Sequence, residues 1–310
     1  MKDFGVTYYS DSRTANYYTL INDFARWYLF RSNHAYDHSC DVTVSYDYSC
    51  DVSISMNKQF NSKFNVIVLS GSHATHNFTP FKGRDKYYAV GGMERPWDVG
   101  TFKHTEGLYL FQSDNLIVWD LVQDDPIITS KTQGYNSCMS WKGSEFDTQP
   151  TTLWNGEKYI MILRDNVKSG IRFIQVGFSD DLIDWEFQPI KIKEFDDNHD
   201  NYYHMVFNKY KDFYIGLTPY YTDKVCCIKL MTSKDCITWD LVDDLFVAPP
   251  AIRKKVSCKA KFKNECHPVN YISIKNGIMN FFCNHNYRGY DADRDVYIKE
   301  YKLDLREYGL

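Results

Sequence analysis

The sequence contains no apolar run long enough to cross a bilayer, and residues 1–5 lack the apolar segment that opens a secretory signal. It contains no long basic run either, and its formal net charge is -4. A protein that binds nucleic acid through its phosphates needs clustered lysine and arginine. These absences predict a cytoplasmic protein whose partner is neither a membrane nor a nucleic acid.

Motifs for nucleotide chemistry and for serine or zinc hydrolysis are missing as well. We find no Gly-x-Gly-x-x-Gly, no phosphate-binding Gly-x-x-x-x-Gly-Lys-Ser/Thr, no His-Glu-x-x-His and no Gly-x-Ser-x-Gly. The nine cysteines include no Cys-x-x-Cys pair, which is typical of free thiols in a reducing compartment. We therefore expect no cofactor and no metal. The oligomeric state is not predicted.

Aromatic residues, by contrast, are abundant. They make up 17% of the chain and include 25 tyrosines, which favours sheets because aromatic side chains fit a pleated surface. The pattern Ser-x-(Asp or Asn)-x-Ile-x-Trp occurs three times, at residues 113–119, 179–185 and 233–239, each time after a pair of expected strands around a polar turn. A fourth unit without this pattern begins near His267 and turns at Asn276-Gly277, a good hairpin signal.

The repeat predicts the fold. Units of short strands at intervals of roughly 55 to 70 residues indicate an all-β five-bladed β-propeller, with four-stranded antiparallel blades around a central channel. Closing the ring buries the aromatic faces and protects strand edges, so the repeated tryptophans are expected to pack between blades. We predict a single domain over residues 1–310, with an N-terminal blade and closure over about 1–62 and four recognisable blades over about 63–310.

The N-terminal blade is the least regular part of this prediction. Residues 17–31 fit two strands about Asn22-Asp23, which would supply the fifth blade, but they also fit an amphipathic helix. Residues 41–46 and 51–56 alternate as strands do.

Polar residues at the starts of the inner strands are the candidate site. In a propeller the first strand of each blade lines the channel, so these side chains should converge on one pocket. Asp147 stands at such a position, with Gln149 beside it. The corresponding residues of other blades, expected to bind substrate, are His76, Asn77, Tyr203, His204 and His267.

These motifs resemble the five-bladed β-propeller glycoside hydrolases, the superfamily of invertases, levansucrases, arabinanases and β-xylosidases (families 32, 43 and 68). The resemblance rests on residues 146–150 ahead of residues 153–159. Residues 76–81, 107–109 and 163–165 are most similar to uncharacterised family 32-like proteins of bacteria and giant viruses. It covers roughly residues 65 to 300, and a viral source would add virion association to the expected cytoplasmic location.

The resemblance implies a carbohydrate ligand and a mechanism based on three carboxylates from successive blades. Asp147 matches the transition-state stabiliser, although Phe146 and Thr148 depart from the family's Arg-Asp-Pro motif. The nucleophile's place is taken by His76-Asn77 and the acid's place by Tyr203-His204. Hydrolysis of a glycoside needs an acid and a second carboxylate, and loss of acid-base assistance forfeits about two to four orders of magnitude in rate. Two of the three expected carboxylates are therefore absent.

Other residues are candidates to replace them. Glu265 is the candidate second catalytic carboxylate if it faces the channel rather than lying in a surface loop. Arg164 and Asp165 are expected to pair with each other or to reach the ligand. The three histidines near the inner strands suit proton transfer near neutral pH, or they suit a metal site together with Asp147, or they only hydrogen-bond strands and sugar hydroxyls.

The sequence thus predicts a glycoside hydrolase-like protein that acts on a glycosidic bond in the channel. The alternative is a glycan-binding propeller that has lost two catalytic carboxylates. A propeller that serves as a platform for other proteins is a third possibility, favoured if side chains fill the channel.

Overall fold

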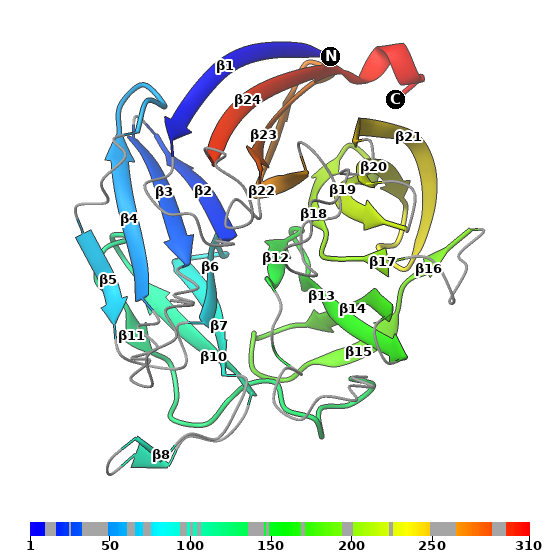
Figure 1. Cartoon of the computed structure of the whole chain (residues 1–310). Coiled ribbons are helices and arrows are strands. Elements are labelled where there is room, and N and C mark those ends of the chain that lie inside the picture. The colour runs from blue at the N-terminus through cyan, green and yellow to red at the C-terminus, as the bar shows by residue number, and fades with distance from the viewer. Residues whose placement is uncertain are drawn as a thin grey trace, which may run out of the picture.

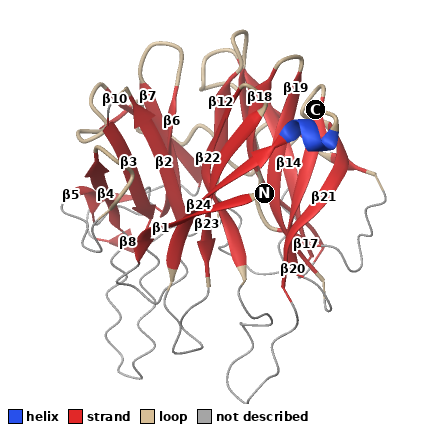
Figure 2. Ribbon diagram, turned by 90° about the horizontal axis from the view of Figure 1, so that it is seen from above, coloured by secondary structure: helices blue, strands red, loops and turns tan. Residues whose placement is uncertain are grey.

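Antiparallel strands make up nearly all of the regular structure, arranged as sheets around a common centre (Figure 1). The computed structural model describes residues 1–9, 17–24, 26–32, 49–60, 66–70, 76–93, 98–99, 102–103, 107–135, 146, 149–168, 171–193, 201–222, 226–248, 265–286 and 296–310. The fold is an all-β propeller, as the sequence predicts. In Figure 2 the strands of the sheets run in one general direction, and a short 3-10 helix, Leu305–Tyr308, follows the last of them.

Two of the sheets have four strands each. One has the order β11-β10-β7-β6 and comprises β6 (His76–Lys82), β7 (Tyr87–Met93), β10 (Gly107–Ser113) and β11 (Asp120–Leu121). The other runs from β12 to β15 and comprises β12 (Thr151–Trp154), β13 (Tyr159–Lys168), β14 (Ile171–Ser179) and β15 (Glu186–Pro189). A separate two-stranded ladder joins β8 (Asp98–Val99) to β9 (Phe102–Lys103).

The third sheet has six strands in the order β16-β21-β20-β19-β17, with β18 also paired to β19. It comprises β16 (Lys191–Ile192), β17 (Asn201–Tyr202), β18 (Val206–Tyr210), β19 (Phe213–Tyr221), β20 (Cys226–Ser233) and β21 (Thr238–Ala248). The strand β16, which directly follows the β12–β15 sheet in sequence, pairs in parallel with β21 and so belongs to the next sheet.

The last sheet has eight strands in the order β1-β24-β23-β22-β2-β3-β4-β5. It comprises β1 (Lys2–Tyr9), β2 (Tyr17–Asp23), β3 (Arg26–Ser32), β4 (Ser49–Ser55), β5 (Val66–Ser70), β22 (Cys266–Lys275), β23 (Ile278–His285) and β24 (Tyr297–Asp304). Its two halves meet at one parallel pair, Thr19 opposite Asn270. The N-terminal strand β1 pairs with β24, in the half of the sheet formed by the C-terminal strands, and not with β2, the next strand in sequence.

Residues 17–31 form the strand pair β2–β3, so the helix alternative is wrong. Residues from Tyr17 to Ile21 are all buried, which removes the polar and apolar alternation that would have marked a half-exposed strand. The predicted strand at residues 51–56 is confirmed as part of β4, whereas residues 41–46 lie outside the described residues.

The five innermost strands contact one another in a closed order: β2 with β6, β6 with β12, β12 with β18, β18 with β22, and β22 with β2. This order supports the count of five blades, which stays a prediction, as does the single-domain assignment. It also brings the polar starts of these strands toward one axis.

The three Ser-x-(Asp or Asn)-x-Ile-x-Trp segments are tight turns. In the second, the Ser179 hydroxyl accepts the Leu182 N–H at 2.9 Å, and the indole N–H of Trp185 donates to the Leu182 carbonyl at 2.8 Å. Leu182 has a left-handed φ of 72°, a conformation that a non-glycine residue adopts at a cost. The three tryptophans, Trp119, Trp185 and Trp239, are buried, each in a hydrophobic cluster shared by two neighbouring sheets, as predicted.

Candidate functional site

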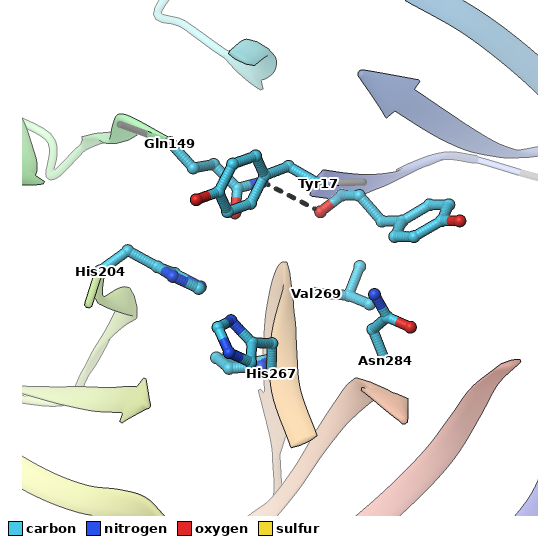
Figure 3. Close-up of a pocket in the computed structure, with 8 residues that line it drawn as sticks. Tyr17, Gln149, His204, His267, Val269 and Asn284 are labelled. Atoms are coloured by element: carbon cyan, nitrogen blue, oxygen red, sulfur yellow. Dashed lines mark hydrogen bonds between the residues drawn. The ribbon is translucent and has the colours of Figure 1, made fainter. Parts of the chain in front are cut away.

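A small pocket lies where the inner strands meet (Figure 3). Its volume is about 170 Å³, including space open to solvent, and its enclosed part has room for about one water molecule. Strands β2, β22 and β23 contribute to it, together with the segments before β12 and before β18. The lining residues are Tyr17, Tyr18, Gln149, His204, His267, Pro268, Val269 and Asn284.

Gln149 fixes one wall of this pocket. Its side chain is buried, and Nε2 donates to the backbone carbonyl of Tyr18 at 3.2 Å. In Figure 3 Gln149 and Tyr17 lie together on one side, across from His204 and His267. The structure thus places Gln149 at the pocket wall, and its role in binding stays a prediction.

His204 is fully enclosed beside the pocket. Burial, the nearby His267 and the Arg164 guanidinium lower the pKa of His204 well below its usual value, although the Pro268 carbonyl partly opposes this. Neither ring nitrogen makes a hydrogen bond of normal geometry with the described residues. Tyr17 packs its ring edge-on against the imidazole, with 5.9 Å between centroids. His204 is therefore a neutral imidazole, and its ring nitrogens can form hydrogen bonds with a ligand or a water molecule.

His267 belongs to a buried polar chain on β22. The Tyr221 hydroxyl donates to Oε1 of Glu265 at 2.7 Å and also makes a short contact with Nε2 of His267. Nε2 of His267 lies 3.4 Å from the same carboxylate oxygen. Glu265 is only 3% exposed, so the alternative of a surface loop carboxylate is wrong, while its catalytic role stays a prediction. A charged group is buried at this depth only when partners compensate it, and Tyr221 and His267 do so.

A cation and aromatic cluster stands next to this chain. The Arg164 guanidinium lies 4.5 Å from the centre of the Tyr203 ring, and the Arg172 guanidinium lies 5.2 Å from it. Nη2 of Arg164 is 3.5 Å from the Tyr17 hydroxyl. The ring of Tyr203 packs at 5.4 Å from that of His267. Arg164 therefore sits behind the pocket wall and adds positive charge there.

Asn77 lies away from the described pocket. It is fully buried on β6, with a left-handed φ of 54° that asparagine tolerates better than most residues. Its carbonyl accepts the Thr79 hydroxyl at 2.8 Å, within an irregularity of the β6–β7 ladder between His76 and Thr79. This residue shapes the start of β6.

Besides Asn77, the predicted site residues divide into those that line the pocket, those that support its wall and those outside the described part of the structure. Gln149, His204 and His267 line one pocket, while Glu265, Tyr203 and Arg164 support its wall. His76 and Asp165 lie on β6 and β13, but their side chains are outside the described part of the structure. Asp147, the central candidate, lies outside the described residues altogether.

The sequence did not point to several residues of the pocket and its wall. Tyr17 and Tyr18 lie on an inner strand whose unit carries no repeat motif. Tyr221 ends β19 and Asn284 lies on β23, so neither begins an inner strand. The two tyrosines could have been found only if the sequence had identified β2 as an inner strand.

The described residues include no group of three His, Cys, Asp or Glu side chains arranged to hold a metal ion. Within the same ranges, no helix has both the length and the apolar character needed to span a bilayer.

Comparisons with known proteins place the fold. No family model matches the sequence, and no curated protein matches it in sequence. The N-acetylgalactosamine deacetylase from F. plautii, solved in complex with blood group B trisaccharide, superposes with a TM-score of 0.61 and 14% identity, covering 99% of this chain and 96% of that chain.

Two glycoside hydrolases are also similar in structure. The GH43_1 enzyme from Xanthomonas citri complexed with xylotriose has a TM-score of 0.57 at 11% identity, covering 93% of this chain and 87% of that chain. The Bombyx mori GH32 β-fructofuranosidase has a TM-score of 0.54 at 10% identity, covering 97% of this chain and 61% of that chain. At such identities the likeness shows the fold alone, which is that of the family 43 and family 32 propellers.

Proposed function

We propose that the protein binds a carbohydrate in the central channel and acts on a glycosidic bond there. The observation that carries the proposal is the convergence of Gln149, His204 and His267, from three inner segments, on one pocket. A few convergent polar groups in a concave site are typical of a ligand site. The propeller neighbours solved with a trisaccharide and with xylotriose support a sugar as the ligand.

In this proposal Asp147 stabilises the transition state, as the resemblance to the propeller glycoside hydrolases implies. Glu265 and the histidines provide the remaining ionisable groups, since His76-Asn77 and Tyr203-His204 take the places of the other two carboxylates. The other predicted binding residues are Arg164, which lies behind the pocket wall, and Asp165, whose side chain is outside the described part of the structure. We also propose that the protein is cytoplasmic and that it is related to the family 32-like proteins of bacteria and giant viruses.

The test is a hydrolysis screen of the purified protein on aryl glycosides and oligosaccharides. We expect turnover of at least one substrate, reduced at least a hundredfold in Asp147→Asn, because a carboxylate that stabilises charge only in the transition state contributes several kcal/mol. Asp180→Asn, on an exposed turn outside the channel, is the matched control and should keep full activity. Turnover that is equal in the wild type and Asp147→Asn would contradict the assigned role.

A second candidate is a glycan-binding propeller without catalysis. It is favoured by the engagement of Glu265 with Tyr221 and His267, which occupies the one carboxylate described at this wall. In that case no glycoside turns over, but a matching oligosaccharide raises the melting temperature of the wild type. A screen in which nothing turns over and nothing stabilises the protein would reject both candidates.

A further inference from the structure

The hydroxyl of Tyr221 contacts both Glu265 and His267, so the position of its single hydrogen decides which group donates in each contact. A tyrosine hydroxyl has one hydrogen, and that of Tyr221 is donated to the Glu265 carboxylate at 2.7 Å. The contact between Tyr221 and Nε2 of His267 must then use the hydroxyl oxygen as acceptor. Nε2 of His267 therefore carries a hydrogen in this arrangement.

This order favours the tautomer of His267 that carries its hydrogen on Nε2. With a hydrogen held on Nε2 by Tyr221 and by Glu265 at 3.4 Å, the ring can gain or lose a proton only at Nδ1. A hydrogen-bonded carboxylate behind an imidazole is the arrangement that orients catalytic histidines and stabilises their protonated form. The chain thus prepares His267, and not Glu265, for exchange of a proton.

The two pocket imidazoles have opposite environments. His204 has no charged partner of its own, and burial, with the charge of His267 and Arg164, opposes its protonation. His267, 5.4 Å away between ring centroids, has a carboxylate behind it. Two groups of the same type that are protonated over different pH ranges, because their surroundings differ, are typical of a site with one acid and one base. The geometry gives His204 the role of a neutral hydrogen-bonding group and leaves proton exchange to His267.

We propose that Glu265 is a positioning residue, which through Tyr221 holds His267 as the proton-exchanging residue of the channel, while neutral His204 binds an oxygen of the same ligand. This deepens the proposed function and rests on it. When the glycosidic C–O bond breaks, the proton on Nδ1 of His267 moves to the leaving oxygen and the ring becomes neutral. Water then forms the new C–O bond at the anomeric carbon and returns one proton to Nδ1.

Several ionisable groups surround His267 and enter its protonation balance. The Glu265 carboxylate stabilises the protonated form of His267, whereas the positive charge of Arg164, which lies against the Tyr203 ring, destabilises it. The ionisable groups on the described elements packed against His267 are Glu265 before β22, Tyr221 of β19, Tyr203 and His204 before β18, Arg164 of β13, Arg172 of β14, Tyr17 of β2 and Cys226 of β20, which interacts with Glu265.

The direct test is nitrogen NMR of the histidine side chains during a pH titration, which needs no substrate. We expect the Nε2–H tautomer for His267 in the wild type. In Glu265→Gln the fraction of the Nε2–H tautomer should fall, because the carboxylate that helps to hold this hydrogen is lost. Tyr221→Phe should also lower it and should mix the tautomers. Tyr221→Phe keeps the carboxylate, so it provides the readout if Glu265→Gln does not fold.

A matched control exists in the same sheet. Tyr301 and His285 form a second tyrosine and histidine pair, with 2.7 Å between the hydroxyl and Nε2, outside the pocket. Tyr301→Phe should alter the signals of His285 and leave the titration of His267 unchanged. A His267 titration that is identical in the wild type, Glu265→Gln and Tyr221→Phe would overturn the relay.

The activity screen separates this inference from the proposed function. If no glycoside turns over while the titration behaves as expected, the proposed hydrolysis fails and the relay remains. If turnover occurs, His267→Gln should lose it, and Glu265→Gln should keep part of it with the pH profile displaced to lower pH. Loss of turnover in Glu265→Gln with unchanged His267 titration and unchanged pH dependence of residual activity would make Glu265 the acid itself and overturn its positioning role.

Discussion

Gln149 and Tyr18 are 131 residues apart in sequence, yet Nε2 of Gln149 donates to the Tyr18 carbonyl at 3.2 Å. The bond joins the segment before β12 to β2 along one wall of the pocket (Figure 3). It therefore fixes the pocket wall and couples two distant parts of the ring.

Replacement of Gln149 by alanine should lower the free energy of unfolding by about 1–2 kcal/mol, because it removes a buried hydrogen bond and leaves the Tyr18 carbonyl without this donor. Urea denaturation measures the effect. Gln133→Ala is the control, since Gln133 makes its side-chain bond to Glu186 at the exposed surface, and we expect a change within about 0.5 kcal/mol. Equal effects of the two substitutions would contradict a structural role for the Gln149 bond.

The acidic turns should make stability depend on acid pH. Burial raises the pKa of Asp181, but backbone N–H groups of Asp184 and Ile183 and the Ser179 hydroxyl outweigh it and hold the pKa below its usual value. Asp235 is held in the same way. A carboxyl with a lowered pKa in the folded state contributes stability above about pH 4, which is lost as the pH falls further.

The double substitution Asp181→Asn with Asp235→Asn should therefore flatten the loss of stability between pH 5 and pH 3, as urea denaturation at each pH would show. The turn itself should survive, because Asn115 already occupies this place in the first repeat and accepts the amides of Ile117 and Val118. Asp180→Asn, on an exposed neighbour, should leave the pH dependence as it is. A double variant with the wild-type slope would show that these carboxylates are not linked to folding.

Gly216 leaves room for the fully buried ring of Trp239. A Cβ at position 216 would lie 2.7 Å from Cζ3 of Trp239 and 2.8 Å from Sδ of Met205. Gly216→Ala should destabilise the protein by about 1–3 kcal/mol through overpacking. In a double-mutant cycle Trp239→Phe should absorb part of this cost, whereas Trp185→Phe, in another core cluster, should add independently. Strict additivity with Trp239→Phe would contradict the contact.

His204 should make the protein less stable in mild acid. Its pKa is well below the usual value in the folded state, chiefly through burial, so below about pH 6.5 the unfolded chain binds a proton that the folded chain rejects. The stability that this ring contributes is present above that pH and is lost as the pH falls. Thermal or urea denaturation at pH 7.5 and pH 5.5 should show a smaller loss for His204→Asn than for the wild type. Identical losses would mean that the folded protein accepts the proton.

The propeller could be predicted because its signal is local and repeated. Each Ser-x-(Asp or Asn)-x-Ile-x-Trp turn is held by hydrogen bonds within seven residues, as between Trp239 and the Cys236 carbonyl at 2.9 Å, so the sequence alone specifies it. The strand pair β2–β3 was ambiguous because burial on both faces of Tyr17 to Ile21 removes the period of two.

The site could be predicted only in part, for a different reason. Gln149, His204 and His267 begin inner strands or stand just before them, and topology alone brings them together. The burial of Glu265 could not be read from its surroundings in sequence, since it depends on Tyr221, 44 residues away. Carboxylates are exposed by default, and only the tertiary partner reverses that expectation.

The pairing of β1 with β24 has a consequence for biosynthesis. The Thr7 hydroxyl donates to the Ile298 carbonyl at 3.2 Å, over a separation of 291 residues. At about 5 to 20 residues per second, the first strand leaves the ribosome roughly 15 to 60 s before its partner exists. During that time its edge and the exposed side chains of Phe4 and Tyr9 are open to other chains, so aggregation during translation should depend on this strand more than on any contact in the channel.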